Sequence, residues 1–308
     1  MIKHLIDFHT HFPVDHEPHQ EKRSLHPEVL HYKKELRRIW REQFKFDDPE
    51  TEHPGNAVQL QRWKQEVTTY DIQKVVFVTG GGNQVLSDLI KDSPEFIGFA
   101  HHDLSEDGAY EKLKFAVEEL GLSGYKWFGP LMRKPFDSPE LKPFWTYLND
   151  HRLPCLIHFG VLGGPGGTVY HPYINPLTIG NVVQTYVDIP FVFPHFGAGY
   201  WQELLQLAWS SPNVYVDSSG SNDWVRWMPY PLTLTDLFQK AYETIGPQRM
   251  IFGTDSNNFP RGFSKRYLDL QEAACLNIGM SKEDMQKFFG GNAARLLKIS
   301  QPKSVVIE

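Results

Sequence analysis

The stretch "HLIDFHTHF" (residues 4–12) has the apolar character of a buried β-strand and carries two histidines, His9 and His11, separated by one residue. Side chains in a strand alternate between its two faces, so both imidazoles and Asp7 lie on the same side. A His-x-His pair alone is weak support for a metal site, because the chain has 14 histidines and most histidines belong to a surface or a core. The interpretation therefore depends on what else converges on the same place.

Seven further β-rich runs follow along the chain, at residues 74–80, 96–103, 123–129, 154–160, 190–197, 213–220 and 249–255. Most are continuously apolar, which is typical of parallel strands buried on both faces. Helix-like stretches separate them, at 138–151, 175–187, 200–211, 233–246 and 281–299. Eight strands alternating with helices predict an α/β fold of the (β/α)8 TIM-barrel type, with an open doubly wound sheet as the alternative.

Two helix starts have capping signals. Ser138 followed by Pro139 predicts the start of the helix over 138–151. Ser281 with Asp284 three residues later has the pattern of a capping box. The glycine-rich "TGGGNQ" (79–84) lacks the spacing of a dinucleotide-binding fingerprint, so we interpret it as a structural loop.

Residues 14–58 interrupt the alternation with many charges and histidines. We interpret them as an insertion on the barrel rim, partly helical around 27–44, within a single domain over residues 1–308. The five histidines of this insertion follow no metal-site spacing. A loop after the first strand could nevertheless close over the site.

The net charge of the chain limits which kinds of partner the protein can bind. A net charge of -6 without a basic cluster argues against nucleic acid or an anionic membrane as partner. No apolar run approaches the roughly 20 residues that span a bilayer. A strand beginning by residue 4 leaves no room for a signal peptide, and Cys155 and Cys275 lie in apolar contexts. We therefore expect a cytoplasmic protein with reduced cysteines.

Polar groups recur where the predicted strands end, namely His9, His11, Lys126, His158, His195 and Asp255. In a barrel, these ends meet at one face, where the chemistry collects. Burying several imidazoles and a carboxylate there is costly without a partner, and a divalent metal supplies one. Nitrogen and oxygen ligands suit zinc, with a position left for water or substrate. Asp217 also ends a strand, and a helix-capping role explains it equally well.

The motifs in this order are similar to those of the amidohydrolase superfamily: "DFHTHF", "LIHFG", "FVFPHFG", "NVYVDSSG", "IFGTDSN" and the terminal "KEDMQKFFGGNAARLLKI". More narrowly, they resemble its amidohydrolase 2 branch, which includes aminocarboxymuconate-semialdehyde and resorcylate decarboxylases. The resemblance covers about residues 1–13 and 59–300. The motif set is specific for the superfamily and not for a substrate.

The resemblance implies that His9, His11, His158 and Asp255 bind one divalent metal, Zn²⁺ or alternatively Mn²⁺. It implies that His195 and Asp255 transfer protons, with a second-metal ligand as the alternative role of His195. A lysine at the position of Lys126 is carboxylated in binuclear relatives. We favour the simpler interpretation that Lys126 pairs with a substrate carboxylate or a neighbouring acid.

Loops after the strands supply candidate substrate-binding residues: Lys126, Arg133, Tyr170, Trp224 and Arg226. Aromatic and cationic groups suit a small, carboxylated or aromatic substrate. Arg261 in "NNFPRG" is a further loop cation, and for any one such residue an exposed loop charge is the simpler interpretation.

We expect a metal-dependent hydrolase of a small amide, ester or lactone that uses a metal-activated water. The alternative is a metal-dependent, non-oxidative decarboxylase of a small unsaturated or aromatic acid. A catalytically silent barrel should lack a ligand, and no ligand of the set is missing. The resemblance to the decarboxylases also allows a homodimer.

Overall fold

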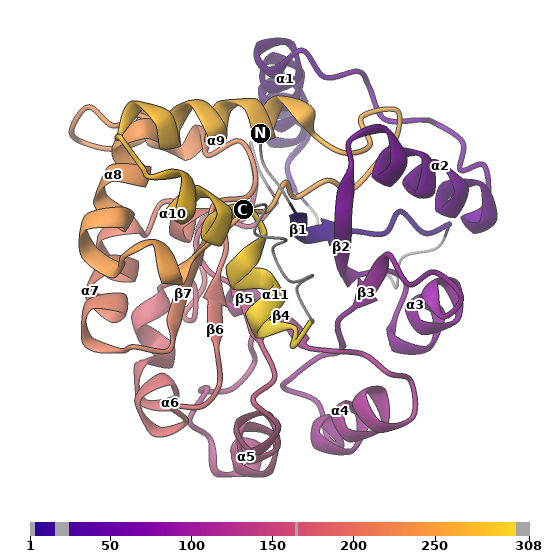
Figure 1. Ribbon diagram of the computed structural model, residues 1–308, viewed down its shortest axis with the longest axis vertical. Helices are drawn as coiled ribbons and strands as arrows, with labels where there is room; N and C mark the ends of the chain where they lie inside the picture. Colours follow the sequence, from indigo (N-terminus) through magenta and orange to yellow (C-terminus); the bar gives the residue numbers. More distant parts are fainter. Residues whose placement is uncertain (1–3, 16–24, 164–165, 300–308) are drawn as a thin grey trace, which may run out of the picture.

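The computed structural model describes residues 4–15, 25–163 and 166–299, in which eight parallel strands alternate with helices (Figure 1). The strands are β1 (Leu5–His11), β2 (Ile72–Thr79), β3 (Phe96–Gly98), β4 (Tyr125–Phe128), β5 (Cys155–His158), β6 (Phe191–Phe193), β7 (Val214–Asp217) and β8 (Met250–Ile251). Each strand overlaps one of the eight predicted runs. The α/β TIM-barrel prediction is confirmed.

The strands follow one another in chain order around a ring. Regular pairing forms the sheets β1-β2-β3 and β4-β5-β6-β7-β8. Isolated parallel bridges join the two sheets, Ala100 with Tyr125 and Thr10 with Ser256, so the ladder is not continuous at these junctions. The last strand nevertheless reaches the first, because the backbone N–H of Asp255 donates to the His9 carbonyl at 2.8 Å. A sequential order of this kind belongs to a barrel and not to a doubly wound sheet.

Apolar side chains fill the inside of the barrel below the strand ends. This interior cluster includes Phe8, Val76, Phe99, Leu156, Val192 and Ile251. Leu156 comes two residues before His158 on the same face of β5, so the cluster lies directly beneath the polar strand ends. Ala293 and Leu296 of the last helix belong to the same cluster. A second, larger cluster packs the outer faces of the strands against the surrounding helices.

The helices that surround the strands are α1 (Pro27–Phe44), α2 (Asn56–Thr69), α3 (Asn83–Ile90), α4 (Ala109–Glu118), α5 (Lys142–His151), α6 (Gly180–Thr185), α7 (Trp201–Ser210), α8 (Leu234–Ile245), α9 (Lys265–Asn277), α10 (Lys282–Gln286) and α11 (Asn292–Leu296). None of the helices in the described part of the chain is both long and apolar enough to cross a membrane.

The two predicted helix starts have different outcomes. The Ser281 hydroxyl accepts the N–H of Asp284 at 3.1 Å, which confirms Ser281 as the cap of α10. Ser138 makes no such capping bond, since a 3-10 turn over Pro139–Leu141 comes first and α5 begins only at Lys142.

The predicted terminal helix over 281–299 is divided in the structure. A π-helical turn over Lys287–Gly291 separates α10 from α11. A Cβ on Gly290 would lie 1.9 Å from the carbonyl oxygen of His4, so the close approach of this turn to the start of β1 requires glycine. This tertiary contact explains why the helical pattern does not continue unbroken.

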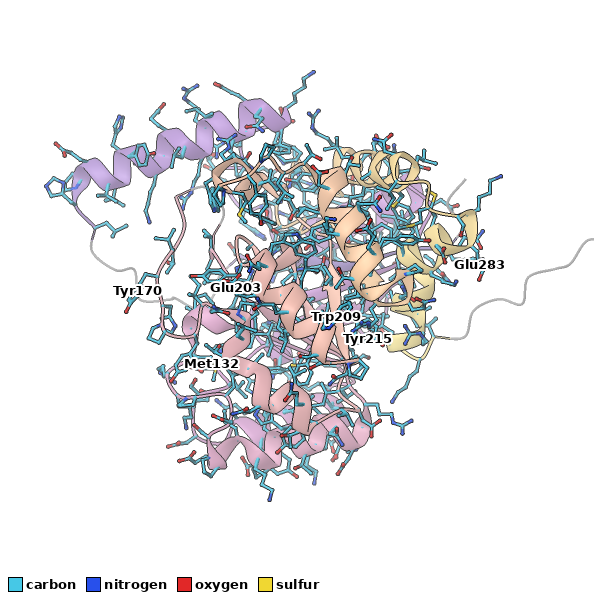
Figure 2. All side chains as sticks on the ribbon, turned by 90° about the vertical axis from the view of Figure 1, so that its left-hand side faces the viewer. Met132, Tyr170, Glu203, Trp209, Tyr215 and Glu283 are labelled. Carbon is cyan, nitrogen blue, oxygen red and sulfur yellow. The ribbon has the colours of Figure 1, made fainter. Side chains whose placement is uncertain are left out.

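The insertion forms α1, with the bounds expected around 27–44, and its residues 16–24 lie outside the described part. Helix α1 projects beyond the rest of the barrel in Figure 2, and Phe44 at its C-terminal end is its buried residue. Its C-terminal end is anchored, because Trp40 donates from Nε1 to the Ser221 hydroxyl at 3.0 Å. The Phe44 and Phe46 rings also pack against Tyr267, with centroids 5.9 and 5.5 Å apart. The anchored end of α1 therefore lies over the strand ends.

Candidate metal centre

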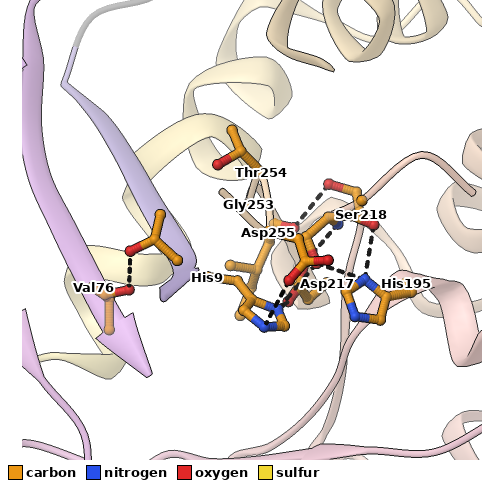
Figure 3. A network of polar contacts seen from close by, with 12 residues as sticks. His9, Val76, His195, Asp217, Ser218, Gly253, Thr254 and Asp255 are labelled. Carbon is orange, nitrogen blue, oxygen red and sulfur yellow. Dashed lines mark hydrogen bonds and ion pairs between the residues drawn. The ribbon is translucent and has the colours of Figure 1, made fainter. Parts of the chain in front are cut away.

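His9 is completely buried on β1, and its two ring nitrogens have different surroundings (Figure 3). Nδ1 lies 2.7 Å from Asp217 Oδ2, at the end of β7, and 3.0 Å from the Ser219 hydroxyl. If Nδ1 donates its hydrogen to Asp217, then Nε2 carries the lone pair. Burial and the nearby Lys126 lower the pKa of His9 well below its usual value, which favours the neutral ring.

The free nitrogen of His9 supplies a test of whether a metal fits here. Nε2 is buried and has no hydrogen-bond partner among the described residues. Asp255 Oδ1 lies 3.7 Å away, which is too far for a hydrogen bond. Ligand atoms of His9, His195 and Asp255 all lie within 4.8 Å of one another. The imidazoles of His9 and His195 together with the Asp255 carboxylate are ligand groups that fit a zinc-like cation.

Asp255 links this cluster to the second histidine of β1. Its Oδ1 lies 3.1 Å from His11 Nε2, while His11 Nδ1 lies 2.6 Å from the Thr79 hydroxyl. Burial by itself raises the pKa of the Asp255 carboxyl, but His195, His11 and His9 together lower it well below its usual range. Asp255 is therefore the ionised carboxylate of the group that it forms with His9 and His195.

His195 follows β6 and stacks on His9, with ring centroids 5.1 Å apart. Its Nδ1 lies 3.0 Å from the Ser219 carbonyl, so this nitrogen donates and Nε2 is the basic one. His195 and Asp255 have φ angles of 57° and 59°, in the left-handed region that glycine prefers. Such strain is often found at functional sites, where the surrounding structure holds it.

His158, on β5, borders the cluster without joining the group of atoms within 4.8 Å. Its ring centroid lies 5.0 Å from that of His195. Nε2 donates to the Val161 carbonyl at 3.0 Å, so Nδ1 carries the lone pair. Burial is the largest cause that lowers the pKa of His158 well below its usual value. The nearby His195 and Lys126 lower it further.

Lys126, on β4, is only 1 % exposed. Burial lowers the pKa of its ammonium group to about 7, although Asp255 and Asp217 oppose the shift. Its Nζ lies 4.6 Å from the centre of the Phe128 ring. Such a buried amine, close to a histidine and carboxylate cluster, can hold a proton or an anionic ligand.

A cavity of about 840 Å³ opens above the cluster, and the six predicted strand-end groups all line it: His9, His11, Lys126, His158, His195 and Asp255. Its size suits a small organic ligand.

The predicted substrate-binding residues separate into two groups. Trp224 lines the cavity and donates from Nε1 to the His195 carbonyl at 3.1 Å, and Lys126 lies at the cavity wall. The described residues that line the cavity do not include Arg133, Tyr170 or Arg226.

These three side chains are engaged elsewhere or exposed. Arg133 pairs with Asp103 at 2.6 Å, and Arg226 pairs with Asp223 at 2.9 Å. Tyr170 is 81 % exposed and lies at the outer edge of the molecule in Figure 2. A cationic side chain in a loop after a strand can thus form an ion pair outside the cavity, although the loop lies close to the strand end in sequence.

Sequence reasoning missed two contributions to the site. From the sequence, a helix-capping role explains Asp217 equally well, yet its carboxylate holds His9, and its position at a strand end is the available signal. Trp40, Arg41 and Phe46 of the insertion line the cavity. The sequence allows this insertion to close over the site, but no spacing in it identifies these three residues.

The described geometry can be compared with known proteins. The family model described as Amidohydrolase matches residues 6–299. No curated protein matches the sequence.

Solved structures share the fold at low sequence identity. A probable 2-pyrone-4,6-dicarboxylic acid hydrolase from Acinetobacter baumannii is 14 % identical, with a TM-score of 0.62 over 96 % of this chain and 100 % of that chain. A 2,6-dihydroxybenzoate decarboxylase from Rhizobium is 18 % identical, with a TM-score of 0.60 over 96 % and 98 %. An amidohydrolase from Burkholderia multivorans with bound zinc is 17 % identical, with a TM-score of 0.62 over 96 % and 99 %.

At these identities the structural likeness shows the fold alone, whereas the family match extends over nearly the whole described chain. The protein therefore belongs to the Amidohydrolase family and, within it, to the amidohydrolase 2 branch.

Proposed function

We propose that this protein is a metal-dependent hydrolase of a small amide, ester or lactone. The observation that carries the proposal is the buried, unpaired Nε2 of His9, in a group with His195 and Asp255. An imidazole held by Asp217 through its other nitrogen is oriented as metal-binding histidines are. The zinc bound to the Burkholderia multivorans amidohydrolase of the same fold supports zinc as the metal.

His9, His11, His158 and Asp255 would hold one divalent cation, through Nε2 of His9 and Nδ1 of His158. The cation would supply Lewis-acid chemistry, since it polarises a carbonyl oxygen and makes a water more acidic. His195 accepts a proton at Nε2, because its Nδ1 is engaged by the Ser219 carbonyl. The ionised Asp255 carboxylate offers a second base beside it.

Two residues are proposed to hold the substrate. Lys126 lines the same cavity as His9, His195 and Asp255. Among the described residues, no carboxylate forms an ion pair with it. Its amine can therefore bind a substrate carboxylate. Trp224 gives an apolar wall next to His195. These two residues suit a small substrate that carries a carboxylate.

Decarboxylation of a small acid is the second candidate, and one observation favours it. Trp40 and Phe46 of the insertion line the cavity beside the strand ends, where apolar groups reduce the access of water. Decarboxylation benefits from a dry site, whereas hydrolysis needs water at the reacting carbon. In that reaction His195 or Asp255 would deliver a proton to carbon.

Elemental analysis of freshly purified protein tests the common part of both proposals. We expect about one zinc or manganese per chain, lost in Asp255→Ala and retained in Arg133→Met, a matched surface change. Absence of metal from the unaltered protein would refute a metal-dependent mechanism. Two metals per chain would instead make Lys126 and His195 ligands of a binuclear centre.

Activity assays on the metal-loaded protein then distinguish hydrolysis from decarboxylation. Ester and lactone panels are followed by proton release, amide panels by release of the free amine, and small aromatic acids by release of carbon dioxide. Hydrolysis that disappears in Asp255→Ala supports the proposal. Carbon dioxide release with no hydrolysis would replace the hydrolase by the decarboxylase.

A further inference from the structure

Helix α1 carries a strip of apolar residues that is exposed in the described part of the chain. These residues recur at spacings of three, four and three positions, namely Val29, Tyr32, Leu36 and Ile39. Residues with this spacing lie along one side of a helix. Val29 and Ile39 are exposed, and Tyr32 is 63 % exposed. We call these four residues the α1 strip.

The contacts of α1 with its own barrel come from another side of the helix. Lys33 lies against Gly166, because a Cβ on this glycine would be 2.7 Å from Lys33 Cγ. Trp40 and Phe44 hold the C-terminal end of α1 through the contacts with Ser221 and Tyr267. Most of the stability of a protein helix comes from the packing of its apolar side. The projecting part of α1 therefore needs a partner that packs on the α1 strip.

The open end of the barrel has further exposed apolar residues. They lie in the loops after β5 and β7, namely Val169, Tyr170, Trp227 and Tyr230. Loops that follow the strands of a barrel gather at one end, and in Figure 2 Tyr170 reaches the same outer edge of the molecule as α1. Exposed apolar residues concentrated at one end of a molecule indicate an interaction surface for another macromolecule.

The charges beside the α1 strip indicate what kind of surface covers it. Glu28, Glu35 and Glu42 recur at seven-residue spacing next to the strip, and this acidic border disfavours an anionic lipid surface. Arg38 pairs with Glu35 at 3.0 Å and also with Glu42, which offsets part of the repulsion between these carboxylates and those of an identical helix. An apolar strip with charged residues along its border is the pattern with which helices pair.

We propose that a second copy of this chain covers the α1 strip, with the two α1 helices packed side by side in opposite directions. Helix α1 projects from the open end of its barrel (Figure 2), so an identical helix that projects back from a facing barrel can lie along its length. This arrangement has two-fold symmetry, in which each chain presents the same surface to the other. It also covers the loops after β5 and β7, which two barrels standing side by side would leave exposed.

The dimer has a consequence for the cavity, because Arg37, Trp40 and Arg41 of α1 line it. Packing of the α1 strip against the partner chain holds these three side chains over the strand ends. The dimer itself depends on neither the metal nor the reaction.

Size-exclusion chromatography with light scattering tests the proposal over a range of protein concentrations. We expect the mass of two chains at micromolar concentration. The double variant Tyr32→Glu, Ile39→Glu should raise the dissociation constant at least about 100-fold, because its carboxylates would be buried without partners. The control Trp209→Glu changes a residue of α7 that is 77 % exposed, and it should leave the dimer unchanged. Circular dichroism verifies that each variant is folded.

The mass of one chain at every concentration would overturn the proposal, and co-sedimentation of this monomer with phosphatidylserine vesicles would assign the α1 strip to a lipid surface instead. A dimer that persists in the double variant would show that the interface lies elsewhere. Equal dissociation of the double variant and Trp209→Glu would also refute α1 as the interface. If the double variant did not fold, Tyr32→Ser would take its place, with an expected increase in the dissociation constant of about tenfold.

Discussion

The two ends of the barrel interior differ in how well their side chains satisfy one another. The lower end is a closed apolar cluster in which Phe8 and Phe99 meet edge to face, 5.6 Å apart, and α11 covers the strands. The upper end holds buried imidazoles, an amine and carboxylates, and within the described part of the chain one nitrogen of His9 and one of Arg261 have no hydrogen-bond partner. The same eight strands build both ends.

This difference shows which end is specialised for stability and which for binding. Apolar contacts at the lower end are complete within the chain, so changes there should alter the free energy of unfolding. At the upper end, His9 and Arg261 each have a nitrogen without a partner among the described residues, so changes around these groups should alter ligand binding more than folding. The four predictions that follow test this division, beginning with the largest effect.

Phe99→Ala should lower the free energy of unfolding by about 3–5 kcal/mol, because it opens a cavity in a fully buried cluster. Urea unfolding of the metal-free protein measures the loss. Zinc bound per folded chain should not change. A loss below about 1 kcal/mol would contradict a stabilising role of the lower end.

His101 is an upper-end histidine that is satisfied without a metal. Its Nε2 accepts the N–H groups of Gly80 and Gly82, both at 3.0 Å, and its Nδ1 donates to the Phe99 carbonyl at 2.9 Å. Burial lowers the pKa of His101 from 6.5 to about 4. The unfolded chain therefore binds the proton more readily, and stability is lost as the pH falls from 6.5 to 4.

This group alone should cost about 2–3 kcal/mol over that interval. Unfolding curves at several pH values, compared with those of His101→Asn, measure the contribution. We expect the acid-dependent loss to be smaller in the variant by that amount. Identical pH dependence in the two proteins would show that His101 is not kept neutral by its neighbours.

Asp217→Asn should weaken zinc binding about 10- to 100-fold, or about 1.4–2.7 kcal/mol, because the amide no longer holds the Nδ1 proton of His9 with a charge. Competition with a zinc-binding dye measures the affinity. The metal-free variant should be at least as stable as the original, since burial already raises the pKa of Asp217 to about 6. Unchanged affinity would remove Asp217 from the site.

Arg133→Met should change the free energy of unfolding and ligand binding by less than about 0.5 kcal/mol. Its partner Asp103 is bound in an exposed pair, and such pairs contribute little. Thermal unfolding, and calorimetric titration of the variant and the unaltered protein with the same small carboxylic acid, provide the measurement. A large loss of binding would return Arg133 to the list of substrate-binding residues.

The strands and their order could be predicted because buried parallel strands leave long apolar runs, as in "CLIH" of β5 and "VYVD" of β7. The residues that gather in the cavity could be predicted for the same reason, since strand ends of a barrel converge. His9, Lys126, His158 and Asp255 line one cavity as that rule requires.

Side-chain pairing in loops could not be predicted, because a loop side chain can pair either with a residue beside it or with one from a distant part of the chain. Arg226 pairs with Asp223 beside it, while Arg261 stacks on Phe46 from another part of the chain. The π-helical turn at Gly290 depends likewise on a contact with His4. Propensity describes a segment by itself, and tertiary contacts decide these details.

The hydrogen bond between the backbones of Asp255 and His9 joins residues 246 positions apart (255 − 9). Contacts of such high sequence separation form late, since the chain must first lose the entropy of a very large loop. The cluster that unites His9 with Asp255 thus assembles only when the last strand reaches the first. During synthesis on the ribosome, competence for ligand binding would therefore arise only after β8 and Asp255 have been synthesised.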